Sequence, residues 1–346
     1  MDKKSAVTGP AKNLISLSKR AYFLLERRRY REAEKAFLEA YALDDTNAYV
    51  LVGLGDVCRK LKKFQDAIGY YQKILDLDPD NVFALRGMGN AYRGLQAPEQ
   101  AILYWERYLK CNPDDCHVIV RLADSLRKLD RTEQAKELYL KALRIGGNDK
   151  FAYLGLGNLW YKAGDDDQAQ VYLEKFLALD AGNVAVLTMM GNIYQRRKEF
   201  ARAAGYFEKA LEFDPDNAFA LYGLGNCRRG LSQLREAIAL WQRVLRLEPG
   251  NQNLYTRVGD ALLTLGEVEQ SRFYYQKSLD IGYDQYALMG MANLHLCLKH
   301  YDQALACCNQ ILQRDPGNQR VLKSLLKIYE AKGDATRAEQ IRARML

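Results

Sequence analysis

One stretch of 34 residues near the start of the chain decides the fold. Residues 48–81 read AYVLVGLGDVCRKLKKFQDAIGYYQKILDLDPDN. Apolar residues recur from Leu51 to Cys58, and again from Phe64 to Ile74, at the three- and four-residue spacing of an amphipathic helix. A short polar break separates the two halves. The final Asp-Pro-Asp-Asn ends the stretch, because proline cannot continue a helix and Asp and Asn favour turns and N-caps. The stretch therefore predicts a pair of helices.

The same pattern recurs along nearly all of the 346 residues. Small residues stand at a fixed spacing of 34, as Gly55, Gly89, Gly157, Gly191, Gly225 and Gly259, and in step with them as Ala33, Ala67, Ala101, Ala135, Ala169, Ala203 and Ala237. A fixed period of this length indicates a repeat array, in which each unit buries its apolar face against its neighbours. The predicted repeats are 14–47, 48–81, 82–115, 116–149, 150–183, 184–217, 218–251, 252–284, 285–318 and 319–346. Residues 1–13 are predicted to form a flexible N-terminal tail.

The residues at fixed positions of the repeat resemble those of the tetratricopeptide repeat family. Counted from the first residue of each repeat, they are Leu or Met at position 7, Gly at 8, Ala at 20, an aromatic residue at 24 and Pro at 32. Leu51 stands at position 4, where the family usually has Trp. The resemblance implies an all-α fold, a right-handed superhelical solenoid of about ten helix-turn-helix units that forms a single domain over 14–346. It also implies that the first helix of each unit lines a concave groove that holds peptides.

The small residues predict close packing. Gly or Ala at position 8 would let the first helix approach the second, where Ala at position 20 meets it. The bulky residue at position 24, such as Tyr71 or Trp105, would fill the space between successive helix pairs. Glycines at position 6, such as Gly53 and Gly87, would leave the groove wall low.

Position 9 gives the sharpest functional signal. It lies with positions 2, 5 and 12 on one face of the first helix. Eight consecutive repeats carry Asn or Asp there: Asp56, Asn90, Asp124, Asn158, Asn192, Asn226, Asp260 and Asn293. Asn can both donate and accept hydrogen bonds, so it can pair with the backbone of an extended peptide. The alternative is that these side chains bond to the neighbouring helix.

Basic and aromatic side chains share this face. Position 12 carries Arg59, Arg93, Arg127 and Arg229, whose guanidinium groups can bind carboxylates, or can form ion pairs on a solvated face. Arg86, four residues before Asn90, resembles the basic-plus-Asn pair of the carboxylate clamp of this family, to which Arg121 could add; Val120 and Leu154 do not match that clamp. Position 2 carries Tyr49, Phe83, Phe151, Phe219 and Tyr286, which would be apolar anchor sites if exposed and core residues if not.

Other classes of function find little support. The chain has no phosphate-binding loop and no Ser/His/Asp or Cys/His set, and its three histidines and seven cysteines lack metal-ligand spacing. We therefore expect no enzyme activity, cofactor or metal. We also expect no membrane span and a cytoplasmic location, because the start lacks an apolar signal segment and no apolar run reaches the roughly 18 residues of a membrane helix.

The basic charge belongs to the ends of the chain. Residues 1–31 carry +7 and residues 319–346 carry +4, which leaves −3 for 32–318 out of a total of +8. Nucleic-acid binding is therefore a less favoured interpretation than solvated end repeats. The favoured function is a scaffold that binds a peptide segment of a partner, in part through acidic residues. The alternative is an assembly protein that self-associates, or docks into a larger complex, through its outer faces and basic ends.

Overall fold

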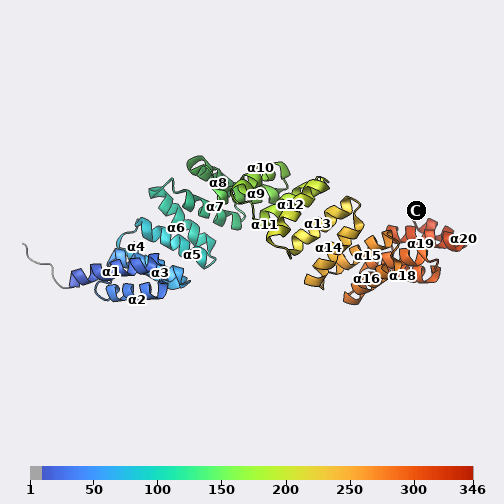
Figure 1. The fold of residues 1–346 in the computed structure, drawn as a ribbon, viewed down its shortest axis with the longest axis horizontal. Helices are drawn as coiled ribbons and strands as arrows, with labels where there is room; N and C mark the ends of the chain where they lie inside the picture. Colours follow the sequence, from blue (N-terminus) through green and yellow to red (C-terminus); the bar gives the residue numbers. More distant parts are fainter. Residues whose placement is uncertain (1–9, 346) are drawn as a thin grey trace, which may run out of the picture. The chain divides into compact units, whose positions relative to one another are not determined.

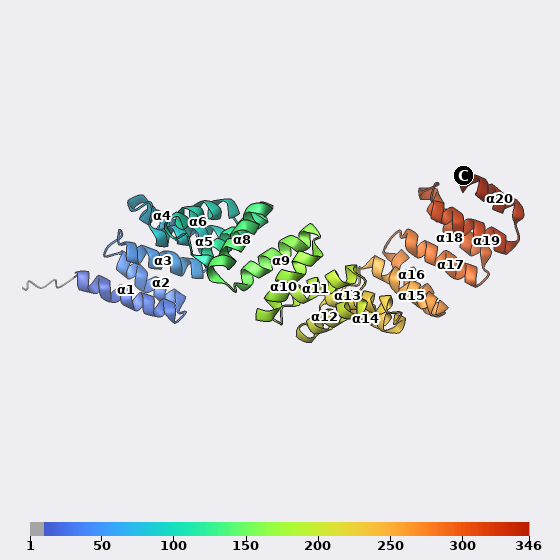
Figure 2. The same cartoon turned by 90° about the horizontal axis from the view of Figure 1, so that it is seen from above.

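The computed structural model describes residues 10–345 as helix-turn-helix pairs, with no strand in that range (Figures 1 and 2). The predicted all-α solenoid of stacked helix pairs is confirmed, because each pair packs against the next one along the chain within each compact unit. The contacts divide the chain into two compact units, up to Asp180 and from Ala181, where the sequence predicts one domain. Since each repeat contacts only its neighbours, a solenoid can be divided between repeats without separating distant contacts.

Within residues 10–345, each unit contains ten helices. In the first unit they are α1 (Pro10–Glu26), α2 (Tyr30–Tyr41), α3 (Ala48–Lys60), α4 (Phe64–Leu77), α5 (Val82–Gly94), α6 (Pro98–Cys111), α7 (Cys116–Lys128), α8 (Thr132–Gly146), α9 (Lys150–Ala163) and α10 (Asp166–Leu179). In the second unit they are α11 (Val184–Arg196), α12 (Phe200–Phe213), α13 (Ala218–Gly230), α14 (Leu234–Leu247), α15 (Gln252–Thr264), α16 (Val268–Ile281), α17 (Gln285–Cys297), α18 (Tyr301–Arg314), α19 (Gln319–Lys332) and α20 (Ala335–Met345).

The first helix begins earlier than the sequence predicts. Helix α1 starts at Pro10, so residues 10–13 are helical and do not belong to a tail. Proline suits this position because the first helical residue needs no hydrogen-bonded N–H and has the φ that proline fixes. The remainder of the predicted tail, residues 1–9, lies outside the described residues.

Two devices set the ends of the helices. The last residue of each of the first nine repeats is Asn or Asp, and its side chain accepts a hydrogen bond from a backbone N–H in the first turn of the next helix, as Asn47 does from Val50 N and Asp115 from Val118 N. The turn inside each pair contains one residue with positive φ. In three pairs this residue is a glycine: Gly164, Gly266 and Gly333. In the other seven pairs it is not: Arg28, Lys62, Gln96, Asp130, Lys198, Ser232 and Lys299. These ten residues all stand at position 15 of their repeats.

The side chain at position 24 determines how the helices pack. Tyr71 is fully buried between two glycines. A Cβ built on Gly55, in the same repeat, would lie 2.4 Å from the Tyr71 ring, and a Cβ on Gly87, in the next repeat, would also lie 2.4 Å from it. The glycine at position 8 therefore receives the position-24 ring, and it also meets position 20, where Ser271 Oγ donates to the Gly259 carbonyl oxygen at 2.8 Å. The glycine at position 6, such as Gly87, lies against the ring of the preceding repeat.

Tryptophan at position 24 changes this arrangement. Trp105 and Trp241 each cover the position-8 glycine of their own repeat, Gly89 and Gly225. In the following repeat, however, position 6 is Arg121 or Arg257 instead of glycine. These two arginines therefore stand at the position where five other repeats have a glycine covered by a ring.

We expect Gly55→Ala to destabilise the chain by about 1–3 kcal/mol, because the added methyl group overlaps the Tyr71 ring and the close-packed surroundings must shift. Gly69→Ala is the matched control. Gly69 lies in the middle of α4, exposed, with nothing within 4 Å of an added Cβ, so the substitution should stabilise by roughly 0.5–1 kcal/mol. Urea unfolding midpoints of the two variants should move in opposite directions. A loss of stability in both would show that helix propensity and not the ring contact decides the outcome.

Candidate functional site

The predicted site residues lie on the first helices of eight repeats. In the first unit they are on α3 (Tyr49, Asp56, Arg59), α5 (Phe83, Arg86, Asn90, Arg93), α7 (Asp124, Arg127) and α9 (Phe151, Asn158). In the second unit they are on α11 (Asn192), α13 (Phe219, Asn226, Arg229), α15 (Asp260) and α17 (Tyr286, Asn293).

The acidic residues at position 9 are held by the core. In three repeats a tyrosine hydroxyl from position 24 of the same repeat donates to the Asp: Tyr71 to Asp56 (2.9 Å), Tyr139 to Asp124 (2.6 Å) and Tyr275 to Asp260 (2.7 Å). In the five repeats with Asn at position 9, position 24 is Trp, Leu, Phe or Cys. For the three Asp residues, the bond to the neighbouring helix is therefore the role that the structure shows.

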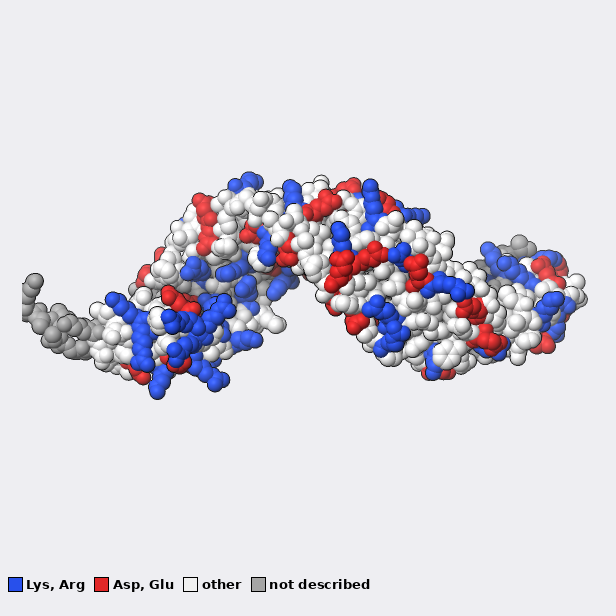
Figure 3. Space-filling model, in the orientation of Figure 1, with Lys and Arg blue, Asp and Glu red and all other residues white. Residues whose placement is uncertain are grey.

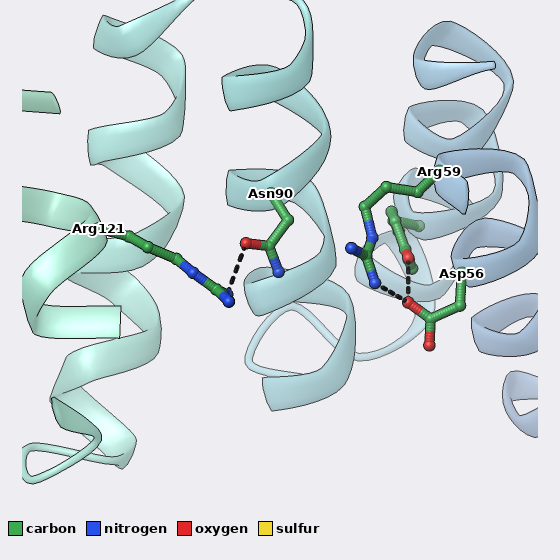
Figure 4. Close-up of polar contacts among 5 residues, drawn as sticks. Asp56, Arg59, Asn90 and Arg121 are labelled. Atoms are coloured by element: carbon green, nitrogen blue, oxygen red, sulfur yellow. Dashed lines mark hydrogen bonds and ion pairs between the residues drawn. The ribbon is translucent and has the colours of Figure 1, made fainter. Parts of the chain in front are cut away.

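Asn90 has a different partner. Arg121, on the first helix of the next repeat, donates through Nη1 to Asn90 Oδ1 at 2.9 Å (Figure 4). Because a guanidinium group only donates, it must face the oxygen of the amide, and the NH₂ of Asn90 points away from it. The same arrangement recurs between Arg257 and Asn226 at 3.5 Å.

A pocket of about 300 Å³, which we call the first pocket, lies beside this contact. It is formed by the first helices of three successive repeats, α3, α5 and α7, and by the residues that flank them. Its lining consists of Val52, Asp56, Arg59, Lys60, Phe83, Arg86, Gly87, Asn90, Asp115, His117, Val118 and Arg121. Five of the predicted site residues thus come together here: Asp56, Arg59, Phe83, Arg86 and Asn90.

Positive charge dominates the first pocket. Burial lowers the pKa of the half-buried Arg121, and the positive charges of Arg93, Arg59 and Arg86 lower it further. An arginine whose pKa is lowered by its neighbours is in a site where an added negative charge would be stabilised. Figure 3 shows Lys and Arg side chains gathered over α1 to α5, whereas both signs alternate over the second unit.

The two carboxylates of the first pocket are already engaged. Asp56 Oδ1 accepts from Arg59 Nη2 at 2.7 Å, in addition to the Tyr71 hydroxyl (Figure 4). Asp115 caps α7 through its Oδ1, and its Oδ2 accepts from the Tyr108 hydroxyl at 2.8 Å. Neither carboxylate forms a hydrogen bond or ion pair with Lys60, Arg86 or Arg121.

An apolar pocket adjoins the first pocket. It has a volume of about 460 Å³ and is lined by Tyr22, Ala48, Tyr49 and Asn81 together with four residues of the first pocket, Val52, Asp56, Phe83 and Arg86. Tyr49 and Phe83 are each 57% exposed, so these two position-2 aromatics are surface groups and not core. The Tyr22 hydroxyl donates to the Tyr49 carbonyl oxygen at 2.9 Å, which fixes the wall of this pocket.

The second unit contains a larger pocket, which we call the second pocket. Its volume is about 610 Å³, and it is lined by Thr188, Asn192, Gln195, Arg196, Phe219, Tyr222, Gly223 and Asn226. The remaining predicted site residues lie outside both pockets: Tyr49, Arg93, Asp124, Arg127, Phe151, Asn158, Arg229, Asp260, Tyr286 and Asn293.

Three residues of these pockets carry a weak signal in the sequence, or none. Arg121 interrupts the glycine series at position 6, and this departure marks it. Lys60 follows Arg59 at position 13, outside the stripe that periodicity assigns to the groove. Tyr22 belongs to the first repeat, whose pattern departs from the others, so the sequence does not place it beside Tyr49.

None of the helices between residues 10 and 345 combines the length and apolarity needed to cross a membrane. The same residues contain no group of three or more His, Cys, Asp or Glu side chains arranged to hold a metal ion.

Comparison with known sequences identifies the repeat. Models of the tetratricopeptide repeat match most of the chain, at residues 19–82, 117–146, 151–181, 184–217, 206–239 and 228–286. The match at 184–217 has the same bounds as the repeat predicted from the glycine spacing. The chain belongs to the tetratricopeptide repeat family. No curated protein matches its sequence.

Solved structures share the fold at low sequence identity. The tetratricopeptide repeat protein YrrB, described as having an unusual peptide-binding site, is 23% identical with a TM-score of 0.50 and covers 53% of this chain and 95% of its own. A tetratricopeptide repeat protein from Parabacteroides merdae ATCC 43184 is 17% identical with a TM-score of 0.52 and covers 72% of this chain and 99% of its own. At this level of identity the likeness concerns the fold alone.

We predict that Tyr139→Phe destabilises the chain by about 1 kcal/mol, because the buried ring keeps its packing but Asp124 loses its 2.6 Å hydrogen bond. Asp124→Asn should also destabilise it. The double variant recreates the Asn and Phe pair found at Asn192 and Phe207, so its loss should be smaller than the sum of the two single losses. Urea unfolding of the four chains measures this coupling. Strictly additive losses would show that the hydroxyl and the carboxylate act independently.

Proposed function

We propose that this chain is a protein-interaction scaffold whose first unit binds an extended segment of a partner and takes an acidic group of that segment in the first pocket. The tetratricopeptide repeat fold is that of an interaction scaffold. To this general role we add two proposals, namely that the partner segment is acidic and that its site is the first pocket.

The observation that supports this proposal most strongly is the arginine cluster around Arg121. Arg86 and Arg121 approach the pocket from neighbouring helices, α5 and α7, and Lys60 from the end of α3. Guanidinium groups bind carboxylates through two parallel hydrogen bonds, and such charge-assisted bonds are stronger than neutral ones. A pocket of about 300 Å³ has room for the carboxylate of an Asp or Glu side chain, or of a chain terminus.

Two neighbouring features suit the rest of such a segment. The NH₂ of Asn90, directed away from Arg121, can donate to a backbone carbonyl whatever the adjacent side chains are. The apolar pocket between Tyr49 and Phe83 can take an aliphatic or aromatic side chain next to the acidic one. YrrB, which shares the fold, is described as having a peptide-binding site.

A second candidate function rests on the outer helices of the second unit. Leu245 on α14 and Phe273 and Tyr274 on α16 line a hollow of about 420 Å³, and Phe273 is exposed. Leu245 is buried and Tyr274 half-buried, so Phe273 is the ring that a partner would cover. Self-association through this hollow is the alternative to peptide binding, and chain mass in solution distinguishes the two.

The proposal can be tested by selecting a phage-displayed random peptide library on the full chain. We expect enrichment of peptides with Asp or Glu beside an apolar residue. Their affinity for the double variant Arg86→Glu, Arg121→Glu should fall by about tenfold or more, because two attractive contacts become repulsive. Affinity should also fall as salt rises, because mobile ions screen exposed charges.

The matched control reverses two arginines elsewhere. Arg131 and Arg144 are exposed at α8, the second helix of its repeat, so their replacement by Glu changes the net charge equally without touching the first pocket. Equal losses in the two double variants would mean that overall charge, and not the pocket, attracts the peptides. Circular dichroism of each variant confirms that the helices remain.

A further inference from the structure

The two pockets occupy the same place in the repeat. Each residue that lines the second pocket stands four repeats beyond a residue that lines the first pocket. The chain carries other marks of this larger period. Trp105 and Trp241 are related by it, as are the two repeats that end in Ile-Gly without proline, at Gly146 and Gly282.

The framework of the pocket is the same in both units. Each pocket has Phe at position 2, Gly at position 6 and Asn at position 9 of its central helix, namely Phe83, Gly87 and Asn90 on α5 and Phe219, Gly223 and Asn226 on α13. The next repeat supplies the arginine that faces the Asn, Arg121 in one unit and Arg257 in the other. The backbone-binding part of the first pocket is therefore present twice.

The charged part is not repeated. Gln195 stands where the first pocket has Arg59, and Tyr222 stands where it has Arg86. Asp56 is likewise replaced by Asn192. The second pocket therefore exchanges ionic side chains for amides and a phenol, and of its lining residues only Arg196 is charged.

We infer that the second unit carries a second, separate peptide site, which takes an uncharged segment with an aromatic or aliphatic side chain. The inference rests on the proposed function, since it assigns to the second pocket the kind of ligand proposed for the first. Chain segments of different charge would then occupy the two units at the same time.

The apolar character of the ligand follows from Phe219 and Tyr222. Phe219 is 82% exposed, which is more than any other large apolar side chain in the described part of the chain, and its counterpart Phe83 is 57% exposed. An uncovered aromatic ring beside a hollow of about 610 Å³ gains most from a ligand that removes it from water. The loss of two cation positions removes the reason for the second pocket to prefer an acidic group.

Asn226 supplies the polar part of the site. It is only 8% exposed, and its contact with Arg257, at 3.5 Å, is at the limit of a hydrogen bond. A buried amide gains from a further hydrogen-bond partner, and the carbonyl of an extended peptide is one that any sequence offers.

The test uses the same phage-displayed random peptide library and the full chain. Peptides from the selection are divided into acidic and uncharged groups, and each is titrated against three variants. We expect the uncharged peptides to lose about tenfold in affinity with Phe219→Ala and to keep their affinity for Arg86→Glu, Arg121→Glu. Phe219 is exposed, so its replacement should leave the fold intact. An acidic and an uncharged peptide should bind together without competition.

The third variant, Gln195→Arg with Tyr222→Arg, gives the second pocket the arginines of the first. We expect its uncharged peptides to bind more weakly, and acidic peptides to bind at two sites per chain. The inference is overturned if no uncharged peptide is selected, or if uncharged peptides respond to Arg86→Glu, Arg121→Glu and not to Phe219→Ala. Uncharged peptides that need Phe219, selected without any acidic ones, would support the second site while contradicting the function proposed for the first.

Discussion

Burial of one large side chain between two repeats is the constraint on which this structure depends. The ring at position 24 packs where its own repeat has a small residue, Gly or Ala, at position 8, and usually where the next repeat has Gly at position 6. Tyr71, between Gly55 and Gly87, shows both contacts. Because interiors pack as densely as organic crystals, the ring fixes the distance between helices within a repeat and between repeats. The stacking of the array follows from that distance.

The same side chain also reaches the face that carries the proposed site. Where position 24 is tyrosine, its hydroxyl emerges beside position 9 and holds an Asp there. Where it is Trp105 or Trp241, position 9 is Asn and the next repeat can place an arginine against it. The buried residue thus helps to determine which polar groups lie on that face. The positions of the core and of the proposed site cannot be treated as independent sets.

The fold could be predicted from the sequence because the 34-residue pattern recurs many times and each copy lies within one short stretch of the chain. The site could be read only in part. Asp56 and Tyr71 are 15 residues apart, and three repeats have an Asp and a Tyr at this spacing. The sequence shows this pairing only to a reader who already compares the two positions. The first pocket is harder, because Arg59, Arg86 and Arg121 come from three repeats, while the net charge of 32–318 is slightly negative. Charge summed along a chain does not indicate charge gathered in space.

The residues with positive φ in the turns inside the helix pairs have a consequence for the evolution of the chain. Seven of the ten described turns place Arg, Lys, Gln, Asp or Ser, rather than glycine, in a conformation that costs such residues roughly 1 kcal/mol. Packing of the flanking helices enforces that conformation whatever the residue is. Selection removes variants that fall below a stability threshold and does not maximise stability. A chain above that threshold can therefore lose some folding stability at these turn positions while its exposed turn residues vary.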